Sequence, residues 1–141
     1  MRVLALDHGL ARCGCAISDP TGTVVRPLPV IEPPDPRDVA RLVAEHDVDV
    51  VVVGLPIGLG GGSGAQAAAA RQFRDEVAAL VDVPVETYDE RLTTRLAERT
   101  ARAGASAAED SLAAAHMLES YLQRRDAALG PDSPDTPEGS E

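Results

Sequence analysis

The sequence predicts an α/β fold, in which a sheet of mainly parallel strands is covered by helices. The chain has 141 residues, which is the length of one domain with one sizeable core. It has no tryptophan and one phenylalanine, Phe73, so the core must consist of valine, leucine, isoleucine and alanine. This composition is typical of a parallel sheet packed against alanine-rich helices. The order of the expected elements, β-β-β-α-β-α-β-α-α, favours the same class.

The first two strands are expected to form a hairpin. Residues 3–6 are a short apolar run that ends in Asp7, which predicts a buried strand with an acid at its carboxyl end. The chain then turns through Gly9, and residues 13–17 have the pattern of a second strand. A short polar turn between two apolar runs predicts that these strands pair.

The only two cysteines, Cys13 and Cys15, alternate along the second expected strand. Their side chains therefore point to one face of one strand, which is poor geometry for a disulfide. Two sulfurs alone do not form a zinc site. We expect both cysteines to be small core residues.

A third strand and the first helix follow. The turn at residues 20–22 leads to a strand expected over residues 23–25, with residues 28–31 trailing off. Proline-rich residues 32–36 form a linker, and a helix is expected over residues 37–46, where apolar side chains recur on one side.

The middle of the chain predicts a strand, a glycine-rich loop and a helix. Residues 48–53 have the clearest strand pattern and run into Gly54-Leu55-Pro56. The glycine-rich loop covers residues 58–64, and a helix over residues 65–81 follows.

The last third predicts one strand and two helices. A strand opens at residue 83 and ends at the Tyr88–Arg91 segment, and a helix over residues 93–103 follows. The last helix starts at Ser106 with a capping-box pattern. We expect one domain over residues 1–125. Residues 126–141 have the composition of a disordered acidic tail.

The charge of the chain limits the ways in which it binds nucleic acid. The net charge of −10 argues against binding by charge alone, although half of it comes from the five acids of the expected tail. All 13 basic residues are arginines, which excludes a Walker lysine and a Schiff-base lysine. Arginine suits bidentate contacts to phosphate. No apolar run has the length of a membrane span and no signal-peptide pattern is present, so we expect a cytoplasmic protein without membrane contact.

Acidic residues mark the ends of three expected elements. Asp7 ends the first strand, Asp89 and Glu90 end the last strand, and Asp110 lies in the first turn of the last helix. Sites in open α/β sheets lie beyond the carboxyl ends of the strands. Each acid also fits a structural role, namely a hairpin cap at Asp7, a helix cap at Asp89 and an exposed helix-dipole contact at Asp110.

Together these acids predict a divalent-metal site. Clustered carboxylates repel one another unless cations hold them, and their hard oxygens suit Mg²⁺ or Mn²⁺. Two such ions can activate a water and stabilise the leaving oxygen in phosphodiester hydrolysis. Asp110 lies in line with an apolar helix stripe, so it needs a metal, an arginine or the helix N-terminus as its partner. His8, His46 and His116 are scattered, and we expect structural roles for them.

The glycine-rich loop has three interpretations. Gly60-x-Gly62-x-x-Ala65, with Asp82 further on, superficially fits a dinucleotide fingerprint, but its glycines start too late after the strand. The loop also fits a plain linker. As a third interpretation, Gly60 and Ser63 contact a substrate phosphate through backbone amides.

Four motifs, in chain order, carry a resemblance to a known family. They are Asp7-x-Gly9-x-x-Arg12-x-Gly14-x-Ala16-x-Ser18-Asp19, Gly54-Leu55-Pro56 with Gln66, Asp89-Glu90-Arg91-Leu92-Thr93-Thr94, and Asp110-Ser111-Leu112-Ala113-Ala114 with Leu118 and Tyr121-Leu122. In all four the chain resembles the YqgF family of pre-16S rRNA nucleases, also called RuvX-type. The resemblance covers residues 1–123.

The resemblance implies an RNase H-like fold related to Holliday-junction resolvases, with a five-stranded mixed sheet and helices on both faces. It implies a cytoplasmic role in maturing the 5′ end of the small-subunit rRNA precursor. The family's acidic positions carry over to Asp7, the Asp89-Glu90 pair and Asp110 as catalytic residues. We expect Glu90 to be the metal ligand of the pair, beside Asp7 and Asp110, and Asp89 to orient it.

The resemblance also assigns Arg12 and Arg91 to contacts with phosphate or to bracing the acids. The chain departs from the family at Ala11, where many members have a basic residue. A second departure is at residues 108–109, where a lysine is common. These losses leave less positive potential around the site, which puts substrate affinity in doubt.

The sequence therefore predicts metal-assisted hydrolysis of structured RNA such as pre-16S rRNA, by a monomer or weak homodimer that the ribosomal particle supplies with substrate. A branched-DNA resolvase is the alternative within this class, and it needs a dimer with two sites about a helical turn apart. A non-catalytic RNA- or transcription-complex-binding factor is the alternative from another class. A sugar-kinase-like phosphotransferase ranks last, because the chain is too short for two lobes.

Overall fold

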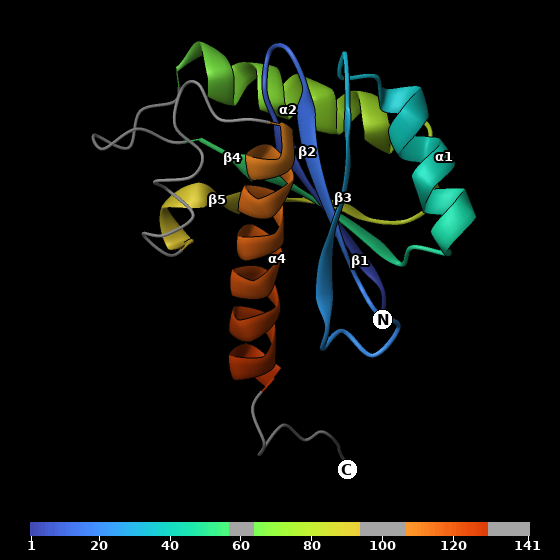
Figure 1. The fold of residues 1–141 in the computed structure, drawn as a ribbon, viewed down its shortest axis with the longest axis vertical. Coiled ribbons are helices and arrows are strands. Elements are labelled where there is room, and N and C mark those ends of the chain that lie inside the picture. Colours follow the sequence, from blue (N-terminus) through green and yellow to red (C-terminus); the bar gives the residue numbers. More distant parts are fainter. Residues whose placement is uncertain (57–63, 94–106, 130–141) are drawn as a thin grey trace.

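The structure is a computed structural model that describes residues 1–56, 64–93 and 107–129. The elements in chain order are β1 (Val3–His8), β2 (Cys13–Ser18), β3 (Val25–Ile31), α1 (Pro36–His46), β4 (Val50–Leu55), α2 (Ala65–Ala78), β5 (Val85–Asp89), the 3₁₀ helix η1 (Glu90–Leu92) and α4 (Ala107–Leu129). The strands form one five-stranded sheet in the order β3-β2-β1-β4-β5 (Figure 1). The helix expected over residues 93–103 lies outside the described residues, apart from Thr93, which is not helical.

The sheet is mixed, as the resemblance implies. β1 and β2 form the expected antiparallel hairpin, and β3 continues it on the far side of β2. β4 pairs with β1 in parallel, and β5 pairs with β4 in parallel. The carboxyl ends of β1, β4 and β5 therefore lie along the same edge of the sheet.

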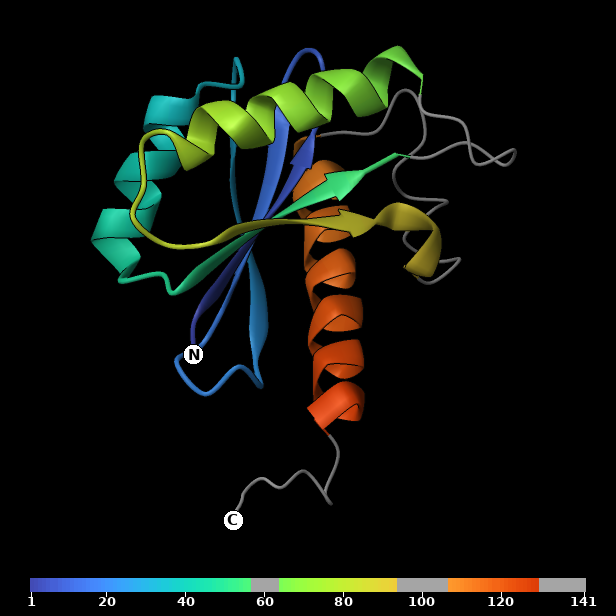
Figure 2. The same cartoon turned by 180° about the vertical axis from the view of Figure 1, so that it is seen from behind.

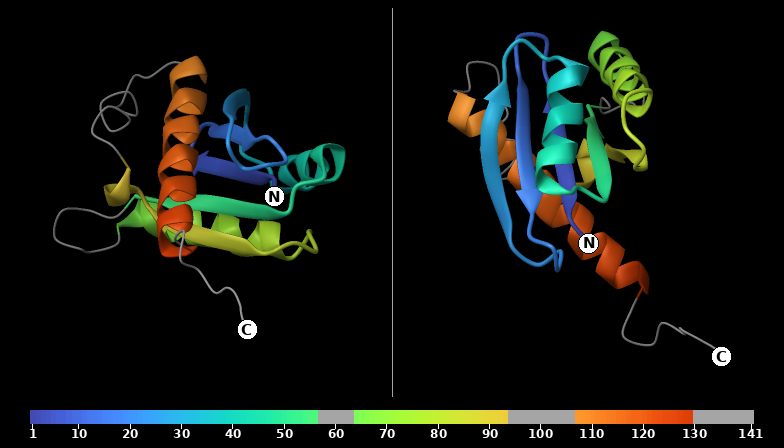
Figure 3. Two further views of the ribbon diagram at one scale, coloured as in Figure 1. Left: turned by 90° about the horizontal axis from the view of Figure 1, so that it is seen from below. Right: turned by 90° about the vertical axis from the view of Figure 1, so that its right-hand side faces the viewer.

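Alternation along β1 separates the two faces of the sheet. Leu4 and Leu6 point into a core with α1 and α2, whereas Val3 and Ala5 point into a core with α4. Figures 2 and 3 show α4 on the side of the sheet opposite to α1 and α2. Both faces are thus covered, which explains why β1, β2 and β4 are apolar at nearly every position.

The third strand differs from its expected position. β3 runs from Val25 to Ile31 and so includes Pro27 and Pro29, which the sequence analysis placed after the strand. β3 is an edge strand, and proline is tolerated there because an edge residue needs no second hydrogen-bonding partner. The expectation of a strand over residues 23–25 was therefore wrong at both ends, since β3 begins at Val25 and continues to Ile31.

Two helix ends also differ from expectation. α2 ends at Ala78 rather than near residue 81, and Leu80 is half exposed. α4 continues to Leu129, so residues 126–129 are helical although the sequence analysis assigned them to the tail. Alanine and leucine favour helix, and only the glycine and proline at residues 130–131 disfavour it strongly. No helix within the described parts of the chain is both long and apolar enough to cross a membrane.

The cysteine prediction is confirmed. Cys13 and Cys15 are free thiols with no exposed surface, and both belong to the core beneath α1 and α2.

Candidate active site

Three carboxylates from distant parts of the sequence line one cleft of about 170 Å³. Asp7 comes from the end of β1, Glu90 begins η1 directly after β5, and Asp110 lies in the first turn of α4. Asp7 continues the alternation of Val3 and Ala5, so its side chain is on the α4 face of the sheet. The parallel strand ends and the start of α4 thus bring together the acids that the sequence pattern singled out.

Gly54 provides the space for Glu90. It lies in β4, between the strands that carry Asp7 and Glu90. A Cβ atom at this position would lie 2.7 Å from Glu90 Oε2 and 2.6 Å from Met117 Sδ, which is closer than real Cβ contacts. The missing side chain therefore allows the Glu90 carboxylate to reach the centre of the sheet edge.

Gly14 provides the corresponding space for Asp110. A Cβ atom there would lie 2.3 Å from the backbone carbonyl oxygen of Asp110. The first turn of α4 consequently packs directly on the backbone of β2.

Ser111 fixes this turn to the sheet. The pairing of β2 with β3 shifts register between Cys13 and Cys15. The Ser111 hydroxyl accepts a hydrogen bond from the Cys15 backbone N–H at 3.3 Å and donates one to the Leu28 carbonyl at 2.6 Å. It thus bridges the irregularity in the sheet and positions the neighbouring Asp110.

Replacement of this hydroxyl should destabilise the fold. We expect Ser111→Ala to lower the free energy of unfolding by about 1–3 kcal/mol, because the Cys15 N–H and the Leu28 carbonyl lose a buried partner. Urea denaturation measures this change. An unchanged midpoint would show that the bridge adds nothing to stability.

Burial and nearby negative charges raise the pKa of two of the carboxyls. Burial is the main cause at both Asp7 and Glu90, and the negative charge of Asp7 raises the pKa of Glu90 further. The two side chains hydrogen-bond to each other, which lowers the pKa of Asp7 and raises that of Glu90. A cation bound beside the two carboxyls would favour their charged forms.

Arg12 holds the third carboxylate. Its guanidinium Nε donates to Asp110 Oδ2 from the turn between β1 and β2, which a hydrogen bond of 3.0 Å from Gly9 N to Arg12 O closes. Of the three partners that the sequence analysis allowed for Asp110, the structure provides the arginine. Both side chains remain about a quarter exposed, so the pair is accessible from the cleft.

Asp89 and Glu90 point in different directions. The Asp89 carboxylate caps η1 by accepting from Arg91 N at 2.9 Å, and it pairs with the Arg91 guanidinium at 2.6 Å. These contacts lower the pKa of Asp89, chiefly through the hydrogen bond from Arg91. Asp89 and Arg91 do not line the cleft, whereas Glu90 does. The expected substrate contacts at Gly60 and Ser63 lie outside the described residues.

The chemistry of the donor set fits a divalent cation, although the donors do not converge. Asp7, Glu90 and Asp110 provide only hard oxygen ligands, the kind that Mg²⁺ and Mn²⁺ prefer. Within residues 1–56, 64–93 and 107–129, however, no three His, Cys, Asp or Glu side chains surround a point that could hold an ion. Asp110 pairs with Arg12, a cation of the protein itself.

Two further side chains line the cleft although the sequence analysis did not assign them to the site. Gln66 comes from the first turn of α2, and it stood in the family motif without a role. His8 follows Asp7 directly, and we expected it to be structural. The only sequence signal for His8 was this adjacency.

The sequence of the chain is similar to those of one known family. A profile of the family described as "RuvX: Holliday junction resolvase" matches residues 1–124. A protein of Chloroflexus aggregans is 44% identical over 133 residues, which cover 87% of this chain and 94% of the relative. A protein of Anaeromyxobacter is 42% identical over 137 residues, which cover 90% of this chain and all of the relative. Both relatives are named "Putative pre-16S rRNA nuclease".

Solved structures show where else this fold occurs. RuvC of T. thermophilus in complex with Holliday junction substrate matches with a TM-score of 0.56 and 17% identity, over 88% of this chain and 96% of that chain. RuvC of Thermus thermophilus in a second structure matches with a TM-score of 0.51 and 16% identity, over 89% and 97%. At this identity the likeness shows the fold alone, which is the expected RNase H-like fold.

Proposed function

The chain belongs to the RuvX family, and from this premise we propose that it is a metal-dependent nuclease that hydrolyses RNA phosphodiester bonds. The proposed substrate is pre-16S rRNA, after which the relatives are named, and the proposed place of cleavage is its 5′ end. One observation carries the proposal: Asp7, Glu90 and Asp110 come from three separate elements and line a single cleft. We also propose that the protein acts in the cytoplasm, where its proposed substrate would be found.

The residues of the chain have distinct roles in this proposal. When bound, Mg²⁺ or Mn²⁺ would supply an activated water and would stabilise charge on the phosphate. Asp7 and Glu90, whose side chains hydrogen-bond to each other, would hold one ion in their charged forms. Asp110 would complete the ligand set, and a second ion fits the same oxygen donors.

Arg12 links substrate binding to completion of this site. Its guanidinium is matched to a phosphate as well as to the Asp110 carboxylate with which it pairs. A substrate phosphate that draws Arg12 away would release Asp110 toward Asp7 and Glu90. The three carboxylates would then be assembled when the substrate is in place.

Arg12→Ala should therefore have opposite effects on two ligands. We expect the affinity for RNA to fall by about tenfold or more, because a charge-assisted contact to phosphate is lost. The affinity for Mn²⁺ should stay the same or rise, because Asp110 loses its competing cation. Fluorescence anisotropy and calorimetry measure the two affinities.

Arg37→Ala is the matched control, since Arg37 is an exposed arginine of α1 that pairs with Asp35 outside the cleft. A loss of Mn²⁺ affinity in Arg12→Ala would contradict the proposed exchange.

The choice of substrate is tested by competition between RNA and branched DNA. Labelled pre-16S 5′-leader RNA and a four-way DNA junction are incubated with the protein and Mn²⁺ or Mg²⁺. Metal-dependent cutting of the RNA alone supports the proposal. Cutting of the junction alone, by a dimer with two sites, would identify a resolvase instead. No cutting of either substrate would favour a nucleic-acid-binding factor.

A further inference from the structure

His8 lies at the end of β1, where it faces both the core and the cleft. It continues the series of Leu4 and Leu6, so its side chain is on the face covered by α2, opposite to that of Asp7. The imidazole ring packs on Phe73 of α2, with ring centroids 4.7 Å apart and planes inclined by 35°. Part of His8 nevertheless lines the same cleft as Asp7.

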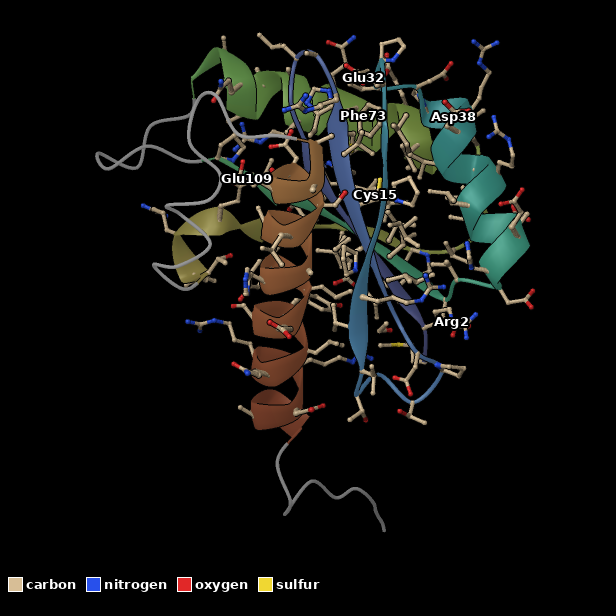
Figure 4. The ribbon with its side chains drawn as sticks, viewed as in Figure 1. Arg2, Cys15, Glu32, Asp38, Phe73 and Glu109 are labelled. Carbon is tan, nitrogen blue, oxygen red and sulfur yellow. The ribbon has the colours of Figure 1, made fainter. Side chains whose placement is uncertain are left out.

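Phe73 packs on the imidazole ring of His8 from the core side. It is the single phenylalanine of the chain, it is 3% exposed, and it belongs to the core between α2 and the sheet. Figure 4 shows Phe73 beneath α2, toward the end of the sheet at which α4 begins. Phe73 thus supports His8, the residue that directly follows Asp7 and lines the cleft.

The contacts of His8 favour a role in which the face of its ring, rather than a ring nitrogen, contacts a ligand. In the part of the chain that the structure describes, no side chain or backbone group is hydrogen-bonded to the ring nitrogens, and His8 is not part of a group of three metal donors. Among these residues the ring nitrogens of His8 therefore lack the hydrogen-bond partner that commonly fixes which nitrogen carries the proton. A ring that is fixed by stacking offers instead a flat apolar surface to a ligand.

We propose that His8 is a nucleotide-positioning residue, whose imidazole stacks on an unpaired base next to the bond that is cleaved. Histidine and aromatic rings stack on unpaired bases in RNA recognition, where each base still has a free face. This inference rests on the proposed function, because it places a nucleotide in the acidic cleft. It also limits the substrate to nucleotides that are unpaired at the cleavage site.

The test separates the ring from its nitrogen atoms. His8→Phe keeps a flat ring against Phe73 and removes the hydrogen-bonding groups, whereas His8→Asn keeps hydrogen-bonding groups and removes the ring. Both changes are made in an Asp7→Asn background that permits binding without cleavage. The probe is an RNA hairpin with a single-stranded 5′ leader that contains 2-aminopurine, whose fluorescence falls on stacking.

Binding and fluorescence give the expected result. His8→Phe should bind within about twofold of its parent and retain the fluorescence decrease. His8→Asn should bind about 5- to 100-fold more weakly and lose the decrease. His116→Asn is the matched control, because His116 contacts Glu119 on α4 and does not line the cleft. Melting curves of all variants show whether the fold is retained.

The opposite results overturn the inference. A stacking role is excluded if His8→Asn binds as tightly as its parent. It is also excluded if both His8→Phe and His8→Asn bind weakly, or if the parent does not bind the RNA. Failure of the proposed function is seen separately, as absence of RNA cleavage by the wild-type protein while binding still depends on the ring of His8.

Discussion

Asp7→Asn is expected to lower RNA cleavage by at least about a thousandfold while making the metal-free protein more stable. The loss of activity follows from the removal of a carboxylate that lines the cleft and hydrogen-bonds to Glu90. The gain in stability follows from the removal of a buried charge. Asparagine still accepts the hydrogen bond that Glu90 donates, so the local contact survives.

The stability gain should depend on pH. The pKa values of Asp7 and Glu90 are raised in the folded protein, so the folded state binds protons more tightly than the unfolded chain. This stabilisation is complete below the ordinary pKa values of carboxyls and is lost as the pH rises through the raised values. Asp7→Asn should therefore gain roughly 1–3 kcal/mol of unfolding free energy near pH 8, and much less near pH 5.

Melting curves at both pH values, with and without Mg²⁺, check this expectation. Mg²⁺ should stabilise the wild-type protein and not the variant, because binding to the folded state alone raises stability. Asp75→Asn serves as the control, since Asp75 is an exposed acid on α2 that does not line the cleft. A variant less stable than the wild type near pH 8 would contradict the buried repulsion.

Gly54→Ala is expected to lower RNA cleavage by about a hundredfold or more without unfolding the protein. The added methyl group would overlap Glu90 Oε2 and Met117 Sδ, so the carboxylate must leave its place. A displacement of about 1 Å in a catalytic group can lower the rate by about two orders of magnitude. The stability cost of such overpacking is about 1–3 kcal/mol.

Gly64→Ala provides the matched control. A Cβ atom at Gly64 meets nothing within 4 Å, and its φ of −88° suits alanine. Single-turnover cleavage by both variants, with melting curves, separates the two effects. Normal cleavage by Gly54→Ala would show that the position of Glu90 is not critical.

The strand pattern was sufficient to predict much of the fold and the approximate site. The apolar run that ends in Asp7 lies in the sheet as expected, whereas β4 (Val50–Leu55) begins and ends two residues later than the strand expected over residues 48–53. The edges were less predictable, since β3 tolerates two prolines only because it has a single neighbour. A neighbour's position in space is not visible in local sequence.

The individual roles at the site depend on contacts between distant residues. Asp89 and Glu90 are adjacent acids, and only the turn into η1 directs one toward Arg91 and the other into the cleft. Arg12 and Asp110 are 98 positions apart. The sequence therefore allowed an arginine as the partner of Asp110 but could not show which arginine it is. We expected a structural role for His8 because the histidines are scattered in the sequence, where its contact with Phe73 of another element is not visible.

Mn²⁺ binding and RNA cleavage, measured on the same samples, test the central claim most directly. Mn²⁺ is titrated into the wild-type protein and into the Asp7→Asn/Asp110→Asn double variant, with labelled pre-16S 5′-leader RNA present. The account predicts that occupancy and cleavage rate rise together in the wild type and that both are lost in the double variant. Cleavage without metal, or metal-dependent cleavage that the double variant retains, would contradict it.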